Sequence, residues 1–183
     1  MAVLMELVSV MPSNIDKFYD LLLIEKNGKR ALSIPVGEYE GQNIALCVDK
    51  VKLSRPLTFD LLCNVLSLAK FETKNIIINK FIDGTFFANI CCMSENEEVL
   101  LDSRCSDAIC VAMKLEIPIL VEEKVLDDAG FEIDNSPAFQ SEAENDCWSI
   151  EELEILLKEA VDNGEEDIAD IIREKIQEIK DNM

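Results

Sequence analysis

Acidic side chains at the ends of the expected strands and helices are the residues of this chain best suited to chemistry. Binding and catalytic groups often gather at such element ends. Clustered carboxylates can hold divalent cations, which activate water and neutralise a phosphate. Metal-assisted hydrolysis of a phosphodiester is therefore the chemistry that such carboxylates could perform. The candidate carboxylates are Glu38, Glu40, Asp60, Asp83, Asp102 and Asp107.

Two arginines and a serine lie among these acids and are candidates for substrate binding. Arg55 and Arg104 can each clamp a phosphate with a two-pronged guanidinium group. Ser106 follows Arg104 by two residues and adds a hydroxyl group. The competing interpretation is that both arginines form structural ion pairs with the acids inside the fold.

Every candidate carboxylate also has a purely structural explanation. Acidic residues stabilise the first turn of a helix, which accounts for Glu38, Glu40, Asp60 and Asp107. Asp83 precedes a glycine and is a typical turn residue. Both interpretations stay open at the level of sequence.

Histidine is absent from all 183 residues. A histidine base, a histidine-bound metal and a serine–histidine pair are therefore excluded within this chain. The seven cysteines form no C-x-x-C pair and are expected to be reduced, buried residues. For Cys105 an alternative stays open, because a first helical turn lowers a thiol pKa and a reactive thiol there is the second interpretation.

The net charge of −20 is concentrated near the C-terminus, where residues 136–183 hold 15 acidic and 4 basic residues. Such a field opposes the binding of polyanions, because their affinity normally comes from Lys and Arg. Any activity on nucleic acid needs a local basic patch, a divalent cation or transient binding. No apolar run reaches the roughly 20 residues of a membrane span, and the first residues do not resemble a signal peptide. We therefore expect a cytoplasmic protein without membrane contact.

Apolar periodicity and turn signals predict an α+β fold with a mainly antiparallel sheet packed with helices. Asn27-Gly28 is a strong hairpin signal, and Asp83-Gly84 predicts a second hairpin. Thr58 is the expected N-cap of the second helix. Strands are expected at 3–10, 18–24, 30–36, 75–80, 85–93, 98–101 and 119–121, and helices at 38–48, 59–69, 104–115 and 124–129.

Three segments are expected: an α+β domain over 1–133, an acidic linker over 134–148 and a helical hairpin over 149–183. Ser149 and Glu152 form a capping box at the start of the hairpin, and Asn163-Gly164 divides its two helices. Helices this short are marginal alone in water, so the hairpin should dock on the body, on a second copy or on another protein.

Four sequence islands, taken together, resemble the bifunctional nuclease domain family of bacteria and plants. They are Ser33-Ile-Pro-Val-Gly-Glu-Tyr-Glu40, Arg55-Pro-Leu-Thr-Phe-Asp60, Asp83-Gly-Thr-Phe-Phe87 and Asp102-Ser-Arg-Cys-Ser-Asp107. The family usually has Arg-Pro-x-Thr-His-Asp in the second island, and Phe59 takes the histidine position here. A mechanism that rests on this histidine cannot transfer to this chain.

The C-terminal hairpin is similar to the UVR motif, a helical hairpin found in excision-repair proteins and stress regulators. Glu166 departs from it, because the motif often has an aromatic residue early in its second helix. An ordinary amphipathic hairpin is the alternative. The matching residues are Leu153, Leu157, Ala160-Val161, Ala169, Ile172-Arg173-Glu174 and Ile176.

These resemblances lead to three functional hypotheses. The first is a nuclease of low sequence specificity for single-stranded RNA and DNA, with Mg²⁺ or Mn²⁺ held by Glu38 and Asp102. The second is a non-catalytic adaptor, in which residues 149–183 bind a protein partner or a second copy to form a homo-oligomer. The third is a thiol sensor using Cys105 or Cys91-Cys92. For the first, the predicted catalytic residues are Glu38, Glu40, Asp60, Asp102 and Asp107, and the predicted substrate contacts are Arg55, Arg104 and Ser106.

Overall fold

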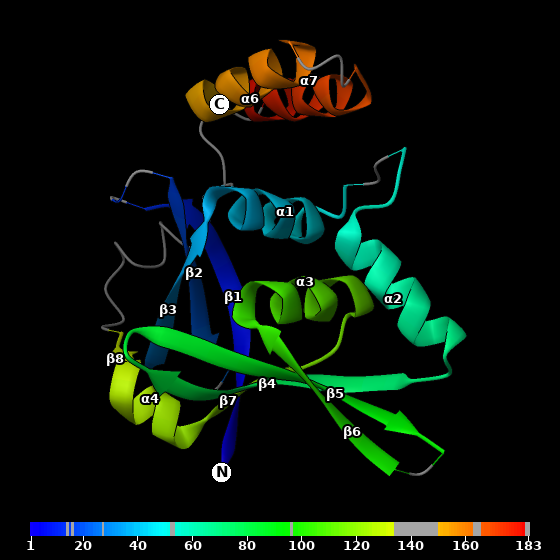
Figure 1. Ribbon diagram of the computed structural model, residues 1–183. Helices are drawn as coiled ribbons and strands as arrows, with labels where there is room; N and C mark the ends of the chain where they lie inside the picture. The colour runs from blue at the N-terminus through cyan, green and yellow to red at the C-terminus, as the bar shows by residue number, and fades with distance from the viewer. Residues whose placement is uncertain are drawn as a thin grey trace.

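An eight-stranded sheet forms the framework of the computed structural model, which describes residues 1–13, 15, 17–26, 28–51, 54–95, 97–133, 150–162 and 166–181 (Figure 1). The strands are β1 (Ala2–Pro12), β2 (Phe18–Glu25), β3 (Arg30–Gly37), β4 (Glu72–Ile82), β5 (Thr85–Ser94), β6 (Glu97–Arg104), β7 (Ile119–Glu122) and β8 (Phe131–Glu132). Their order across the sheet is β6-β5-β4-β7-β1-β2-β3-β8. The helices are α1 (Glu38–Val48), α2 (Thr58–Leu68), α3 (Cys105–Leu115), α4 (Glu123–Ala129), α6 (Ile150–Asp162) and α7 (Glu166–Asp181).

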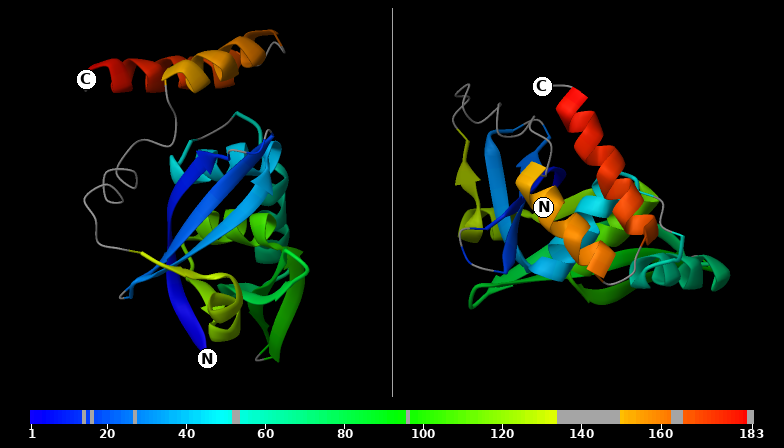
Figure 2. Two further views of the ribbon diagram at one scale, coloured as in Figure 1. Left: turned by 90° about the vertical axis from the view of Figure 1, so that its left-hand side faces the viewer. Right: turned by 90° about the horizontal axis from the view of Figure 1, so that it is seen from above.

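Two antiparallel meanders make up most of the sheet, β1–β2–β3 and β4–β5–β6. The short strand β7 joins them, because it pairs antiparallel with β1 and parallel with β4. The two meanders cross at a steep angle, and α1 and α3 lie in the space between them (Figures 1 and 2). Helix α1 contacts β1, β2 and β3, whereas α3 contacts β4, β5 and β6. This arrangement confirms the α+β class expected from the sequence.

The core fills the angle between the meanders and is built from alternating strand residues and an almost wholly buried helix. Leu21 and Leu23 of β2 and Leu32 and Ile34 of β3 are 0–2% exposed, as the period of two along a strand requires. Helix α3 is short and apolar on most sides, with Ile109 fully buried. Such a helix fits only where protein covers it nearly all round.

Close packing of α1 on the sheet depends on one glycine. A Cβ atom at Gly41 would overlap the ring of Tyr19 on β2. The glycine therefore lets α1 approach the sheet, and this approach fixes where the first turn of α1 lies.

The strands and helices predicted over residues 1–133 are present. Strands β1 and β4 are longer than predicted, and three further differences follow. Strand β6 runs to Arg104 rather than ending at Leu101, because its pairing with β5 continues as far as Arg104 opposite Phe87. The N-terminus of α2 is capped by Asp60, whose carboxylate accepts the Leu57 N–H at 2.9 Å, and not by Thr58, which is the first helical residue. The short strand β8 was not predicted.

The predicted turn at Asp83-Gly84 is confirmed. Both residues have positive φ, 50° and 78°, as a two-residue hairpin turn between β4 and β5 requires. The first hairpin also forms, with Gly28 N–H donating to the Glu25 carbonyl, although Asn27 lies outside the described residues.

Near the C-terminus, α6 and α7 pack against each other as a helical pair (Figure 2). Leu153 of α6 and Ala169 and Ile176 of α7 are buried. The predicted linker 134–148, Ser149 and Asn163-Gly164 lie outside the described residues. In the part of the chain that is described, no helix is long and apolar enough to cross a bilayer.

Two leucines of α2 test how the helix packs. Leu66 is 6% exposed and Leu68 is 84% exposed. We expect Leu66→Ala to lower the free energy of unfolding by about 2–5 kcal/mol, because it leaves a cavity. The matched Leu68→Ala should change it by less than about 0.5 kcal/mol. Urea denaturation measures both, and equal effects would contradict this packing.

Candidate active site

A cavity of about 540 Å³ opens where the first turns of α1, α2 and α3 meet the end of β6. Its lining comes from all four elements and from β5. The lining residues are Tyr39, Glu40 and Asn43 of α1; Thr58, Phe59 and Leu62 of α2; Ile90 of β5; Leu101, Asp102, Ser103 and Arg104 of β6; and Ser106, Asp107 and Cys110 of α3.

Three helix N-termini at one cavity give it a distinct electrostatic character. The first N–H groups of a helix have no acceptor within the helix, and the N-terminus carries a partial positive charge. Each of the three first turns carries acids in response: Glu38 and Glu40 in α1, Asp60 in α2 and Asp107 in α3. All four acids therefore have the same local structural role: each interacts favourably with the partial positive charge at the N-terminus of its own helix.

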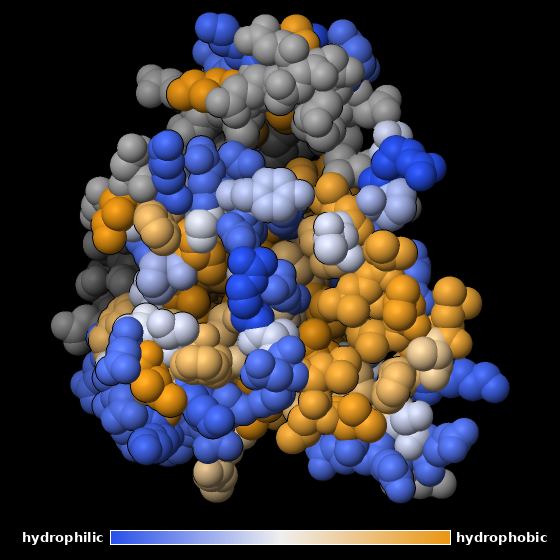
Figure 3. All heavy atoms as spheres, in the orientation of Figure 1, coloured by the Kyte–Doolittle hydropathy of each residue, from blue (hydrophilic) through white to orange (hydrophobic). Residues whose placement is uncertain are grey.

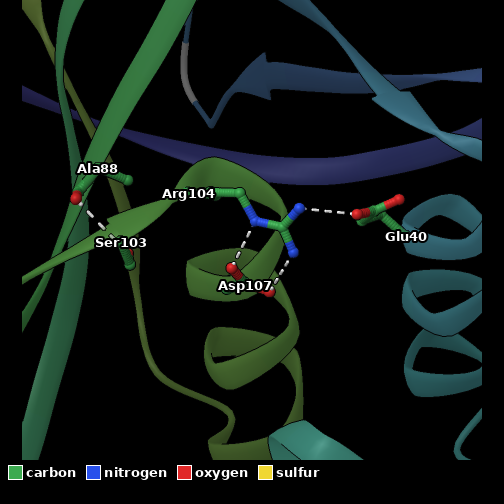
Figure 4. A network of polar contacts seen from close by, with 5 residues as sticks. All are labelled: Glu40, Ala88, Ser103, Arg104 and Asp107. Atoms are coloured by element: carbon green, nitrogen blue, oxygen red, sulfur yellow. Dashed lines mark hydrogen bonds and ion pairs between the residues drawn. The ribbon is translucent and has the colours of Figure 1, made fainter.

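Arg104 connects the first turns of α3 and α1 (Figure 4). Its Nε and Nη2 atoms donate to the two carboxylate oxygens of Asp107 at 2.9 and 3.2 Å, and Nη1 donates to Glu40 Oε1 at 2.8 Å. Hydrogen bonds to Asp107 and then Glu40 raise the pKa of Arg104. The predicted structural ion pair is thus present, and the side chain is nevertheless 66% exposed.

Asp60 lies beside the cavity and is not part of its lining. One carboxylate oxygen caps α2, and the other contacts Lys114 Nζ of α3 at 2.7 Å. This hydrogen bond raises the pKa of Lys114. The Lys114 ammonium also lies 5.9 Å from the centre of the Phe59 ring, which does line the cavity. Asp60 therefore joins α2 to α3.

Asp102 and Ser106 are the two predicted site residues in the cavity lining that have no polar side-chain partner among the described residues. Asp102 is exposed, and its carboxylate forms no ion pair with any described residue. Ser106 is only 6% exposed, and no described residue forms a hydrogen bond with its hydroxyl group. Both groups are available to a ligand.

Two predicted site residues lie away from the cavity. Glu38 is exposed at the start of α1, and Arg55 is exposed before α2. Neither belongs to the lining. Their assignment as a catalytic or metal-binding residue and as a phosphate contact, respectively, stays a prediction.

The carboxylates of this site suit a metal ion that is shared with the substrate better than one held by protein ligands alone. No group of three or more Cys, Asp or Glu side chains in the described ranges is arranged to hold a metal ion. Glu40 and Asp107 are engaged with Arg104, which leaves Asp102. Mg²⁺ is often bound by one or two carboxylates together with substrate phosphates. The donor set therefore fits a cation shared with substrate and not an all-protein cage.

Burial corrects the expectation of a reactive Cys105. This residue is 5% exposed, and burial raises the pKa of its thiol to about 12. The helix N-terminus is too weak to offset the loss of solvent around the thiolate. Cys91 and Cys92 are also buried, and burial raises the pKa of Cys91.

Sequence reasoning missed the uncharged part of the lining. Tyr39, Asn43, Thr58 and Leu62 carry no charge and belong to no catalytic pattern. Helix phase offers a signal: Tyr39 and Asn43 are four residues apart, as are Thr58 and Leu62, so each pair shares one helix face.

An apolar surface formed by Leu61, Val65 and Leu68 covers the outside of α2 (Figure 3).

An α+β domain with a cavity lined by the first turns of three helices has the features typical of a ligand-binding or catalytic domain. The model of the bifunctional nuclease domain matches residues 21–134, which include every lining residue of the cavity. The chain belongs to the bifunctional nuclease domain family.

Two proteins of Mycobacterium tuberculosis are similar to this chain. They are the uncharacterized proteins MT1877 of strain CDC 1551 / Oshkosh and Rv1829 of strain ATCC 25618 / H37Rv. Each is 36% identical to this chain over 110 residues, which is 60% of this chain and 65% of the relative. The chain thus spans less than two thirds of either relative.

The buried thiols give a prediction for chemical labelling. At pH 8 we expect native Cys105 to resist iodoacetamide, because a thiol with a pKa of about 12 holds little thiolate at that pH. The same residue should react readily in denaturant. Peptide mapping by mass spectrometry measures both rates, and rapid labelling of native Cys105 would restore the thiol-sensor hypothesis.

Proposed function

We propose that this chain is a nuclease of low sequence specificity that hydrolyses phosphodiesters in RNA and DNA. The observation that carries the proposal is the convergence of three motif islands, far apart in the chain, on one cavity. They contribute Tyr39 and Glu40, Thr58 and Phe59, and Asp102 to Asp107. Membership of the bifunctional nuclease domain family supports the same reaction class.

Arg104 and Ser106 are suited to bind the phosphate group. The guanidinium of Arg104 is exposed, and its bidentate contact with Asp107 has the geometry that it would use for two phosphate oxygens. Exchange of a carboxylate for the phosphate would keep the positive charge paired. The Ser106 hydroxyl and the first N–H groups of α3 supply further donors in the same wall of the cavity.

Asp102 is the proposed general base. Asp102 belongs to the cavity lining, and its carboxylate is free of ion pairs within the described chain, so it can accept a proton from an attacking water molecule. Phe59 cannot transfer a proton, so the histidine usual in the family has no equivalent at this position. We propose that a carboxylate takes the role of base in this chain.

A divalent cation remains part of the proposal. Asp102 would hold Mg²⁺ or Mn²⁺ jointly with the substrate phosphate, and the cation would neutralise charge on the phosphate. The cation would also reduce the repulsion that three lining carboxylates, Glu40, Asp102 and Asp107, exert on a polyanion.

Asp102→Asn tests the two roles proposed for this carboxylate, base and cation ligand, together. We expect this change to reduce cleavage of end-labelled single-stranded RNA and DNA by at least about 100-fold, the usual contribution of a general base. Asp128→Asn is the matched control, because Asp128 is exposed on α4 away from the cavity. Cleavage should require Mg²⁺ or Mn²⁺ and stop with chelator.

Glu38→Gln in the same assay decides whether the site extends beyond the cavity. Little change is expected, because Glu38 does not line the cavity. Equal cleavage by wild type and Asp102→Asn, purified identically, would indicate a contaminating nuclease. The absence of cleavage in both would reject the proposed reaction.

An adaptor role is the second candidate, and exposed apolar residues of the helical pair favour it. Ile155 is 61% exposed and Val161 is 42% exposed on α6. We propose that these helices, by their similarity to the UVR motif, bind a protein partner or a second copy. Burying both side chains would contribute a few kcal/mol to such an interface.

Removal of residues 149–183 tests this second role. If the pair mediates self-association, light scattering should show a smaller assembly for the truncated chain. Ile155→Asp should weaken assembly in the same direction, while Glu154→Gln beside it should not. An unchanged mass for all variants would exclude self-association through this segment.

A further inference from the structure

Ser106 is almost wholly buried, yet its hydroxyl oxygen keeps some exposure, because no fully buried side-chain oxygen or nitrogen of the described residues lacks a hydrogen-bond partner. It is 6% exposed, it lines the cavity, and no described residue accepts from it or donates to it. Its remaining exposure is therefore to the cavity. A group that enters the cavity is the natural partner of this hydroxyl.

The N-terminus of α3 provides further unused donors next to Ser106. No side chain caps this 11-residue helix. Its first N–H groups consequently lack an acceptor, and they carry the positive end of the helix dipole. Backbone donors of this kind together with a hydroxyl group are typical of a phosphate seat.

Part of the remaining lining is apolar, and two aromatic residues, Tyr39 and Phe59, belong to it. Phe59 and Leu62 of α2 lie with Ile90 of β5 and Leu101 of β6 around the same cavity. Ile90 is 2% exposed, so this part of the wall is well packed. Nucleobases stack on aromatic side chains regardless of sequence.

We propose that the cavity binds one unpaired nucleotide, with its phosphate on Ser106 and the α3 N-terminus and its base against Phe59. The volume of about 540 Å³ lies within the range of small-molecule pockets, about 300–1,000 Å³. A base paired in a duplex is stacked and cannot enter such a cavity. The site therefore selects single-stranded or frayed substrate, and this inference rests on the proposed nuclease function.

Phe59 acquires a role from this placement. It occupies the motif position at which the family usually has histidine, and it belongs to the cavity lining. In this chain the position is a base-binding one. The ring contacts any of the four bases through its face, so the cavity has little preference among them.

Calorimetric titration of the full chain with uridine 5′-monophosphate, uridine and inorganic phosphate tests the proposal. The titrations are run at fixed ionic strength, with and without Mg²⁺. We expect the nucleotide to bind more tightly than either uridine or phosphate, because only the nucleotide fills both parts of the cavity.

Two variants separate the two contacts. Ser106→Ala should weaken the nucleotide about tenfold, as loss of a hydrogen bond to a charged group does, and should affect uridine much less. Phe59→Ala should weaken the nucleotide and uridine by a similar factor, about tenfold, and should leave phosphate unchanged. The matched controls are Ser67→Ala and Phe131→Ala, both exposed outside the cavity. Phe59→Leu, which keeps an apolar side chain, replaces Phe59→Ala if that variant does not fold.

The outcomes distinguish this inference from the proposed reaction. Nucleotide binding with the expected variant pattern, but without cleavage of RNA or DNA, would support the site and reject the nuclease. Cleavage by a protein that binds no nucleotide, or binding that neither variant changes, would overturn the site and leave the nuclease standing.

Discussion

The placement of three helix first turns around one cavity is the constraint on which the rest of the structure depends. Arg104 joins the first turns of α1 and α3, and the first turn of α2 lies beside the last turn of α3. Each N-terminus brings unsatisfied N–H groups and a partial positive charge. Acidic residues in the first turns balance this charge, and two of them, Glu40 and Asp107, bind the guanidinium group of Arg104 (Figure 4). Asp60 has the same role in α2, where its carboxylate accepts the Leu57 N–H, and it also binds Lys114 of α3. The helices are held together by the same charges that surround the cavity.

This arrangement explains how an acidic protein can present a site to a phosphate. The overall charge of −20 repels polyanions at long range, but screening confines most of that repulsion to about 8 Å at physiological salt. Close to the cavity, the helix ends, Arg104 and the hydroxyl of Ser106 oppose it. Asp102 is the lining carboxylate that no described cationic side chain neutralises, so its negative charge is the one that a bound cation would offset.

Local signals in the sequence were sufficient for most of the fold. Asp83-Gly84 predicted its turn because both positions need positive φ, and the helix over 38–48 was predicted with the bounds that α1 has. Pairings between strands far apart in the chain could not be predicted from the sequence. The parallel pairing of β4 with β7 depends on how two meanders meet, and β8 owes its existence to pairing with β3.

The site was predictable in part for the same reason. Glu40, Asp102, Arg104, Ser106 and Asp107 were named from motif islands, and the fold brings these five to one cavity. Glu38 and Arg55 belong to the same islands and lie outside the lining, because an island fixes neighbours in the chain and not the direction of each side chain. The alternative interpretation of a reactive Cys105 was wrong, because burial raises the pKa of its thiol. A local sequence pattern does not show how completely the helix will be buried.

Amide NMR during titration with a short single-stranded oligonucleotide tests the central claim most directly, because it locates the binding surface without requiring turnover. The account predicts chemical-shift changes at residues 39–43, 58–62 and 102–107, the segments that line the cavity. Shifts confined to α6 and α7, or no saturable shifts in a protein that still cleaves the same oligonucleotide, would contradict it.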